Sequence, residues 1–287
     1  MGNALSNALQ AFPPKSKFST DQIPDLSGQV IIVYMASRSK DKADTAIQEL
    51  KAQTDGKEAI FLELDLGNLA SVRKAAEDKE TELHVLVNNA GVMWPPVDHL
   101  TSDGYDLQFG TNVLGHFFFT KLLIPALVAG AGASQDQHSR IVNVSSSASY
   151  LETLHWNTFK DSAERKKMSP NALYCQSKFG NVVVAREFAK RYADKGIVST
   201  SLNPGNIETD LLRYVSPLKR RLLNLLLYPA SQGALTQLWA GTMPETLDYN
   251  GKFLIPWARV GRCRKEAYDD QIGERLWNWL EEQVKDR

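Results

Sequence analysis

The stretch His-Val-Leu-Val-Asn-Asn-Ala-Gly, residues 84–91, decides the fold. Its apolar run at residues 85–87 has the composition of a short buried strand, and small and amide-bearing residues follow it directly. Small residues let a backbone approach a flat ligand closely, and amide side chains can tie neighbouring strands together. The stretch therefore predicts a strand of a sheet that is covered on both faces, with a ligand near the strand's carboxyl end.

Similar apolar runs occur on both sides of this stretch, and segments with apolar residues at helical spacing alternate with them. Such alternation is typical of β-α-β units in a parallel sheet. We therefore predict an α/β, Rossmann-like, doubly wound domain with a mainly parallel sheet of about six strands and helices on both faces. The other predicted strands cover residues 30–36, 59–64, 141–144, 198–202 and 252–255, and the predicted helices begin at Ser39, Asn68, Thr101, Asn171 and about Arg264.

Length, charge and cysteine content narrow the class of protein. The chain has 287 residues, with 33 basic and 33 acidic side chains, whereas nucleic-acid-binding proteins show a basic excess. Its two cysteines, Cys175 and Cys263, are too few for a disulfide framework or a thiolate-rich zinc site. We expect a cytoplasmic protein with no nucleic-acid partner, no metal and no membrane-spanning apolar run. Residues 1–27 are interpreted as a flexible N-terminal arm and residues 28–287 as one domain.

Polar side chains follow three of the predicted strands. Asp65 could accept a hydrogen bond from an adenine amine, although a turn residue at a strand end has the same appearance. Asn89 follows the strand at residues 85–87. Ser146 lies in the serine run after residues 141–144, where a hydroxyl can donate to a substrate carbonyl oxygen.

Tyr174 and Lys178 are four residues apart in a predicted helix, so both project from one face. An ammonium beside a phenol favours the phenolate and lowers the tyrosine pKa from about 10. Such a tyrosine can act as an acid or base nearer neutral pH. A pair on a solvated helix face has the same spacing, so the order of the surrounding motifs decides between the two interpretations.

That order resembles the short-chain dehydrogenase/reductase family over nearly all of residues 26–287. The branch of the family that the sequence resembles most is the retinol-dehydrogenase-like branch, on the basis of residues 111–123, 140–149 and 174–183. The motifs that carry the resemblance are Asn88-Asn89-Ala90-Gly91, Asn112, Ser146, Tyr174 with Lys178, and Pro204-Gly205 followed by Thr209.

The resemblance implies an oxidoreductase that reduces a small-molecule carbonyl or oxidises an alcohol by hydride transfer with a nicotinamide cofactor. It implies that Tyr174 exchanges the proton at the substrate oxygen and that Lys178 lowers the pKa of Tyr174 and holds the nicotinamide ribose. Ser146 would orient the carbonyl, and Asn112 would support a water relay to Lys178.

The resemblance also implies a cofactor site. Arg38 stands at the end of the family's second strand, where a guanidinium suits the 2′-phosphate of NADP and an acidic residue would suit NAD. We therefore expect NADP rather than NAD, although a surface cation before a helix has the same appearance. The residues expected to contact the cofactor are Arg38, Asp65, Asn89, Tyr174, Lys178, Ile207 and Thr209.

One family motif is absent from the chain. A phosphate-binding turn, Thr-Gly-x-x-x-Gly-x-Gly, should follow the first strand, but residues 29–39 contain no glycine. A parallel crossover needs at least a dozen residues, so residues 30–37 can form only one strand, and the first β-α unit is truncated. We expect weak dinucleotide binding. Either the sequence is a shortened variant of a working reductase, or the protein kept the fold and acts as a non-catalytic binding protein.

Residues 210–227 are apolar on one face and carry the basic cluster Lys219-Arg220-Arg221. In the family this region forms a lid over the substrate. A basic amphipathic helix can also rest on a membrane surface, so peripheral membrane contact stays an alternative. Self-association into a homo-oligomer is likewise left open by the sequence.

Overall fold

In the computed structural model the described residues are 10–26, 34–37, 39–54, 56–77, 81–209, 211, 214 and 227–287. Their main feature is a five-stranded sheet whose first four strands are parallel and whose last strand is antiparallel to its neighbour. The predicted α/β, Rossmann-like fold with a mainly parallel sheet is confirmed. The strands, in spatial order, are β3 (Val85–Asn88), β4 (Ser139–Val144), β5 (Ile197–Leu202), β6 (Phe253–Ile255) and β7 (Arg259–Gly261).

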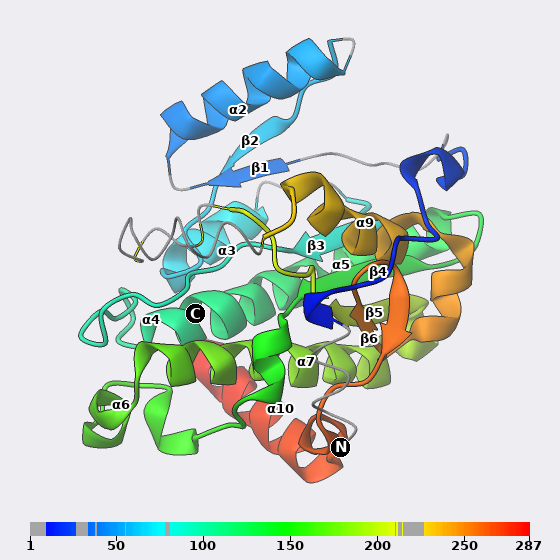
Figure 1. The fold of residues 1–287 in the computed structure, drawn as a ribbon. Coiled ribbons are helices and arrows are strands. Elements are labelled where there is room, and N and C mark those ends of the chain that lie inside the picture. Colours follow the sequence, from blue (N-terminus) through cyan, green and yellow to red (C-terminus); the bar gives the residue numbers. More distant parts are fainter. Residues whose placement is uncertain are drawn as a thin grey trace.

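Helices cover both faces of this sheet (Figure 1). Neighbouring residues of β4 point to opposite faces: Ile141 packs in the larger core cluster with α5 and α7, and Val142 packs against Trp239 of α9. An outer helix, α10, packs on α7. The bounds of these helices are α5 (His116–Ala133), α7 (Pro170–Tyr192), α9 (Ala230–Thr242) and α10 (Asp270–Val284).

The strands β1 (Tyr34–Ser37) and β2 (Ile60–Glu63) form a separate, two-stranded parallel sheet, with α2 (Lys40–Gln53) between them in the chain. One sheet of about six strands was predicted, and the described strands instead divide into two sheets. In a doubly wound sheet the first strand lies between the second and the fourth. The chain lacks a complete first unit, so β1 and β3 are not paired with each other. The first part of the predicted strand at residues 30–37 lies outside the described residues.

The long helical stretch expected from Thr101 begins at α4 (Leu107–Phe109), where the carboxylate of Asp106 accepts hydrogen bonds from the backbone N–H groups of Gln108 and Phe109. It continues through a π-helical segment, η2 (Gly110–Gly115), into α5. By length and composition alone, residues 107–133 could cross a membrane. This signal is weak, because 61 % of the apolar window is buried inside the protein, as in a core helix.

Two residues of the described part of the N-terminal arm are buried against the domain, whereas the other residues in the range 10–26 are exposed or half-buried, and the flexibility of the arm stays a prediction. Gln10 is 1 % exposed, and Phe18 is buried in a core cluster with Leu202 and Trp239. A short 3-10 turn, η1 (Thr20–Gln22), follows with a capping box between Ser19 and Gln22.

Shorter elements complete the chain, and the predicted helix after Asn68 is α3 (Leu69–Glu77), with the Asn68 side chain accepting from the N–H groups of Ala70 and Ser71. The sequence analysis identified neither α9 nor β7. The remaining elements are η3 (Ser147–Tyr150), η4 (Trp156–Thr158), α6 (Ala163–Lys167), η5 (Ala193–Lys195), η7 (Pro244–Tyr249) and η8 (Lys265–Tyr268).

Candidate active site

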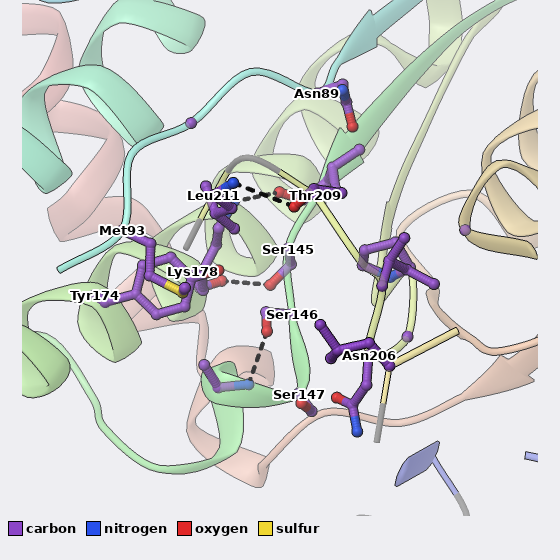
Figure 2. A pocket seen from close by; sticks show the side chains of 18 of the residues that line it. Asn89, Met93, Ser145, Ser146, Ser147, Tyr174, Lys178, Asn206, Thr209 and Leu211 are labelled. Atoms are coloured by element: carbon purple, nitrogen blue, oxygen red, sulfur yellow. Dashed lines mark hydrogen bonds between the residues drawn. The ribbon is translucent and has the colours of Figure 1, made fainter. Parts of the chain in front are cut away.

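A cleft of about 910 Å³ lies beyond the carboxyl ends of β3, β4 and β5. Figure 2 shows the side chains of Ser146, Tyr174 and Thr209 around this cleft, although they come from three distant segments of the chain. The predicted site residues that line it are Asn89, Ser146, Tyr174, Lys178, Ile207 and Thr209.

The first turns of α7 position Tyr174 and Lys178. The helix begins at Pro170, and the Ser169 hydroxyl caps it by accepting from the Ala172 N–H at 3.1 Å. Both functional side chains are buried on one face, as predicted, with the Lys178 Nζ 5.8 Å from the centroid of the Tyr174 ring. The Lys178 ammonium also donates to the carbonyl oxygen of Val144 at 3.0 Å, which fixes it against the end of β4.

Burial controls the pKa values of this pair. It raises the pKa of Tyr174 well above 10, and the Ser146 hydroxyl beside the phenol offsets part of that increase. Burial lowers the pKa of Lys178 from 10.5 to about 8. The family resemblance implied that Lys178 lowers the pKa of Tyr174; the net shift of that pKa is upward, with burial as its largest cause, and the effect of Lys178 stays a prediction. Burial disfavours the charged form of each group, which is the phenolate of Tyr174 and the ammonium of Lys178.

The three serines after β4 have different surroundings. The hydroxyl of Ser145 points inward and donates to the Lys178 carbonyl oxygen at 2.6 Å. Ser146 is only half-buried and accepts at its hydroxyl from the Ala148 N–H at 3.1 Å, which leaves its O–H proton for another acceptor. Ser147 also lines the cleft. The inward bond of Ser145 and the position of Ser146 beside Tyr174 agree with the choice of Ser146.

Asn112 is fully buried in η2, and its side chain is bonded at both ends. Its carbonyl oxygen accepts from the Val92 N–H at 2.8 Å, and its amide donates to the Val92 carbonyl and to the Ser177 hydroxyl, each at 3.0 Å. Asn112 therefore joins the loop after β3 to α7 rather than lining the cleft. A Cβ atom at Gly91 would lie 3.1 Å from the Asn112 oxygen, so a larger residue there would require the Asn112 side chain to shift by a few tenths of an ångström.

The remaining predicted cofactor residues lie elsewhere. Asp65 lines a second cavity of about 600 Å³ that shares Asn89, Ala90 and Gly91 with the catalytic cleft. Its carboxylate accepts from the Gly67 N–H at 2.9 Å, which is the bond of a turn residue. Arg38 lies outside the described residues, as does most of the predicted lid, of which Leu211 and Leu227 line the cleft.

Several lining residues were missed, among them Ala11, Met93, Trp94 and Leu151. No sequence motif marks them, because they reach the cleft from loops and from the N-terminal arm. Within the described ranges no three His, Cys, Asp or Glu side chains lie together as metal ligands would.

The residues of the cleft fit one end of a nicotinamide dinucleotide. Small residues, Ala90 and Gly91, leave room beside Tyr174 and Lys178 for a flat ring, and Ile207 with Thr209 completes this side of the cleft. The other end of such a cofactor needs backbone N–H groups of a glycine-rich turn at a helix N-terminus, and residues 29–39 offer no glycine for that turn.

Comparisons with known proteins agree with this geometry. The model of the short chain dehydrogenase family matches residues 26–220. A short-chain dehydrogenase/reductase of Armillaria gallica is 52 % identical over the whole of both chains, and human retinol dehydrogenase 12 is 34 % identical, covering 88 % of this chain and 78 % of its own.

Solved structures show the same fold. An uncharacterized protein from Mycobacterium paratuberculosis is 28 % identical, with a TM-score of 0.66, and the match covers 88 % of this chain and 84 % of that one. The NADPH-bound carbonyl reductase from chicken fatty liver is 20 % identical, with a TM-score of 0.58 over 80 % of this chain and 87 % of its own. At that identity the likeness shows the fold alone.

Proposed function

The chain belongs to the short-chain dehydrogenase/reductase family, and we propose that it is an NADP-dependent enzyme that reduces a carbonyl compound or oxidises an alcohol. The observation that carries this proposal is the meeting of Ser146, Tyr174 and Lys178 in one cleft, from β4 and α7. These side chains are the groups that carbonyl reduction requires: a donor to the carbonyl oxygen, a proton donor and a cation.

Each group has a distinct task in the proposed reaction. The Ser146 O–H donates to the substrate carbonyl and holds it in place. The Tyr174 phenol gives its proton to the same oxygen during reduction and takes it back during oxidation. Because burial keeps the pKa of Tyr174 high, the phenol stays protonated at neutral pH and is ready to donate. Lys178, buried beside it, would contact the nicotinamide ribose, and the bound nicotinamide would supply the hydride.

The chemistry of the cleft favours an uncharged, apolar substrate. Lys178 is the one charged side chain among its described lining residues. Most of the others are apolar or small, so a carboxylate or phosphate on the substrate would be desolvated with few partners. The apolar side chains that line the cleft include Met93, Trp94, Val144, Leu151, Ile207, Leu211 and Leu227.

The proposal for NADP rests on Arg38, whose guanidinium suits a 2′-phosphate. The other proposed cofactor contacts are Asn89, Ile207 and Thr209, together with Asp65, which would lie near the adenine. Reduced affinity is expected, since the chain has no glycine-rich turn for the pyrophosphate.

A second candidate function follows from that absence: a non-catalytic relative that uses the cleft for binding only. The alignment with the Armillaria gallica relative spans 311 positions, 24 more than the 287 residues of this chain. The relative therefore carries residues without a counterpart here. The transcript sequence across the codons for Val33 and Tyr34 discriminates between the two candidates. An in-frame segment encoding the glycine-rich turn there would favour the enzyme.

Two serine variants test the proposed catalysis. Steady-state oxidation of NADPH is followed with a series of apolar aldehydes, for the wild type, Ser146→Ala and the control Ser147→Ala. Loss of one donor to a developing oxyanion typically lowers kcat about 100-fold, so Ser146→Ala should show such a loss. Ser147→Ala should retain more than half of the activity. Equal activity of both variants would contradict the assignment of Ser146.

We further propose a cytoplasmic location, with residues 210–227 acting as a lid over the substrate. Flotation of the intact chain with liposomes at low salt tests the alternative of a peripheral membrane contact. Recovery in the lipid fraction would favour the membrane contact over the lid.

A further inference from the structure

The N-terminal arm reaches the catalytic cleft through one buried amide. Gln10 is 1 % exposed, and both ends of its side chain are bonded. The Nε2 donates to the Tyr150 hydroxyl at 3.1 Å, and the Oε1 accepts from the Asn203 amide at 2.9 Å. The side chain thus bridges two positions that are 140 and 193 residues away in the chain.

Both partners of Gln10 belong to segments that carry proposed site residues. Tyr150 ends η3, the short helix that Ser146 caps. The Asn203 side-chain oxygen accepts from the Gly205 N–H at 3.0 Å, at the start of the loop that leads to Ile207 and Thr209. Figure 2 shows Ser146, Ser147, Asn206 and Thr209, which all line the cleft.

After Gln10 the arm contacts the domain at two further residues, Ala11 and Phe18. Ala11, the next residue, lines the cleft itself. Phe18 is 6 % exposed and packs among Val142, Leu202 and Trp239 on the α9 face of the sheet. Between these points Phe12 is 68 % exposed, so the arm touches the domain at selected side chains and not along its whole length.

We propose that the arm contributes Ala11 to the wall of the cleft and that Gln10 is a positioning residue, which holds η3 and the loop at residues 203–209 at a set separation. The inference rests on the proposed function for its catalytic meaning, since these two segments carry Ser146, Ile207 and Thr209. A Gln10 amide has one donor end and one acceptor end, and each meets a matching partner. Loss of the amide therefore releases both segments at once.

Gln10→Met tests the proposal in the full chain, because methionine keeps the length of the side chain and removes its hydrogen bonds. Hydrogen exchange followed by mass spectrometry should show peptides from residues 10–18 and 203–209 exchanging at least fivefold faster than in the wild type. Peptides from β4 and α7 should exchange within twofold of the wild type. The matched control is Phe12→Ala, which changes an exposed neighbour and should leave all of these rates unchanged.

Kinetics supply a readout that a merely structural contact would not move. In carbonyl reduction with NADPH, Gln10→Met should raise KM for the carbonyl at least fivefold and change kcat less than twofold. Exchange at residues 203–209 within twofold of the wild type would overturn the positioning role. Acceleration spread evenly over β4 and α7 would overturn it too, since it would show general destabilisation. A wild type without turnover would contradict the proposed function, while the exchange comparison would still decide the role of Gln10.

Discussion

The five-stranded sheet and the β1–α2–β2 unit are built from the same kinds of residue but differ in burial. Every residue of β4 and β5 is buried, because each strand has a strand on either side and helices on both faces. In β2 the two end residues are exposed, and Ile60 is 47 % exposed. Apolar composition alone therefore does not bury a strand in this protein: β4 and β5 are buried because they have a strand on either side and helices on both faces, whereas β2 pairs with β1 alone among the described strands.

The strand β3 lies where the two regions face each other. Leu86 is 9 % exposed and belongs to the main core, whereas Val87, on the opposite face, is 41 % exposed. Among the described strands β3 pairs with β4 alone. The proposed catalytic residues Ser146, Tyr174 and Lys178 come from the end of β4 and from α7, which belong to the five-stranded sheet and its covering helices, whereas Asp65, proposed to lie near the adenine, follows β2 of the two-stranded sheet.

The largest expected effect comes from restoring the missing unit. A family-like glycine-rich turn and helix inserted between Val33 and Tyr34 should tighten NADPH binding at least 100-fold, because two charge-assisted hydrogen bonds of about 1.5 kcal/mol each already give about that factor. The thermal midpoint should rise as well, since the insertion restores a strand between the two sheets. Calorimetric titration and thermal unfolding of both chains are the measurements. Equal affinities would show that other groups hold the pyrophosphate.

In α7, which covers the five-stranded sheet, Tyr174→Phe should abolish most of the catalytic activity. In the chain with the restored turn, this variant removes the phenol proton beside Ser146 and should lower carbonyl reduction by 100-fold or more. The measurement is steady-state reduction with NADPH, with Tyr105→Phe, a buried tyrosine that does not line the cleft, as a comparison. A variant that retains more than a tenth of the activity would place the acid elsewhere.

The pH dependence of the free energy of unfolding tests whether His116 is buried among the helices that cover the five-stranded sheet. Burial lowers the pKa of His116 from 6.5 to about 4, and its Nδ1 lies 3.0 Å from the Asn112 carbonyl oxygen. Between these values the unfolded chain binds the proton and the folded chain does not, so the free energy of unfolding falls as pH falls. The loss from pH 7 to pH 5 should be about 2 kcal/mol. Urea unfolding at both pH values measures it.

The control for this prediction is His116→Gln, which cannot be protonated and should lack that part of the pH dependence. The two chains share all other titrating groups, so the difference between their pH profiles isolates His116. Identical profiles would show that the folded protein admits the charged imidazole.

The smallest expected effect is the difference between two valine variants, one in β4 and one in β3. Val142→Ala, in the fully buried centre of β4, should lower the free energy of unfolding by about 2 kcal/mol. Val87→Ala, on the exposed face of β3, should lower it by about 0.5 kcal/mol. Denaturant unfolding of both variants is the measurement. Equal losses would mean that Val87 is covered in solution.

Much of the fold followed from local pattern. The helix predicted for residues 171–190 is α7 (Pro170–Tyr192), and the strand predicted for residues 198–202 is β5 (Ile197–Leu202). Helical spacing and short apolar runs depend on neighbours within a few positions, so they can be read without the tertiary structure. The strand β7 has three residues and pairs antiparallel with β6, which leaves too short a pattern to recognise.

The sequence by itself determined that the chain is built of β-α-β units and that Tyr174 and Lys178 lie on one helix face. It also determined that residues 29–39 contain no glycine-rich turn. Only the tertiary structure decided that the strands divide into two sheets, that burial raises the pKa of Tyr174, and that Gln10 closes on Asn203. These features depend on contacts between segments far apart in the chain. The desolvation and the hydrogen bonds of a buried group depend on all the residues packed around it. The residues next to that group in the sequence do not reveal which residues those are.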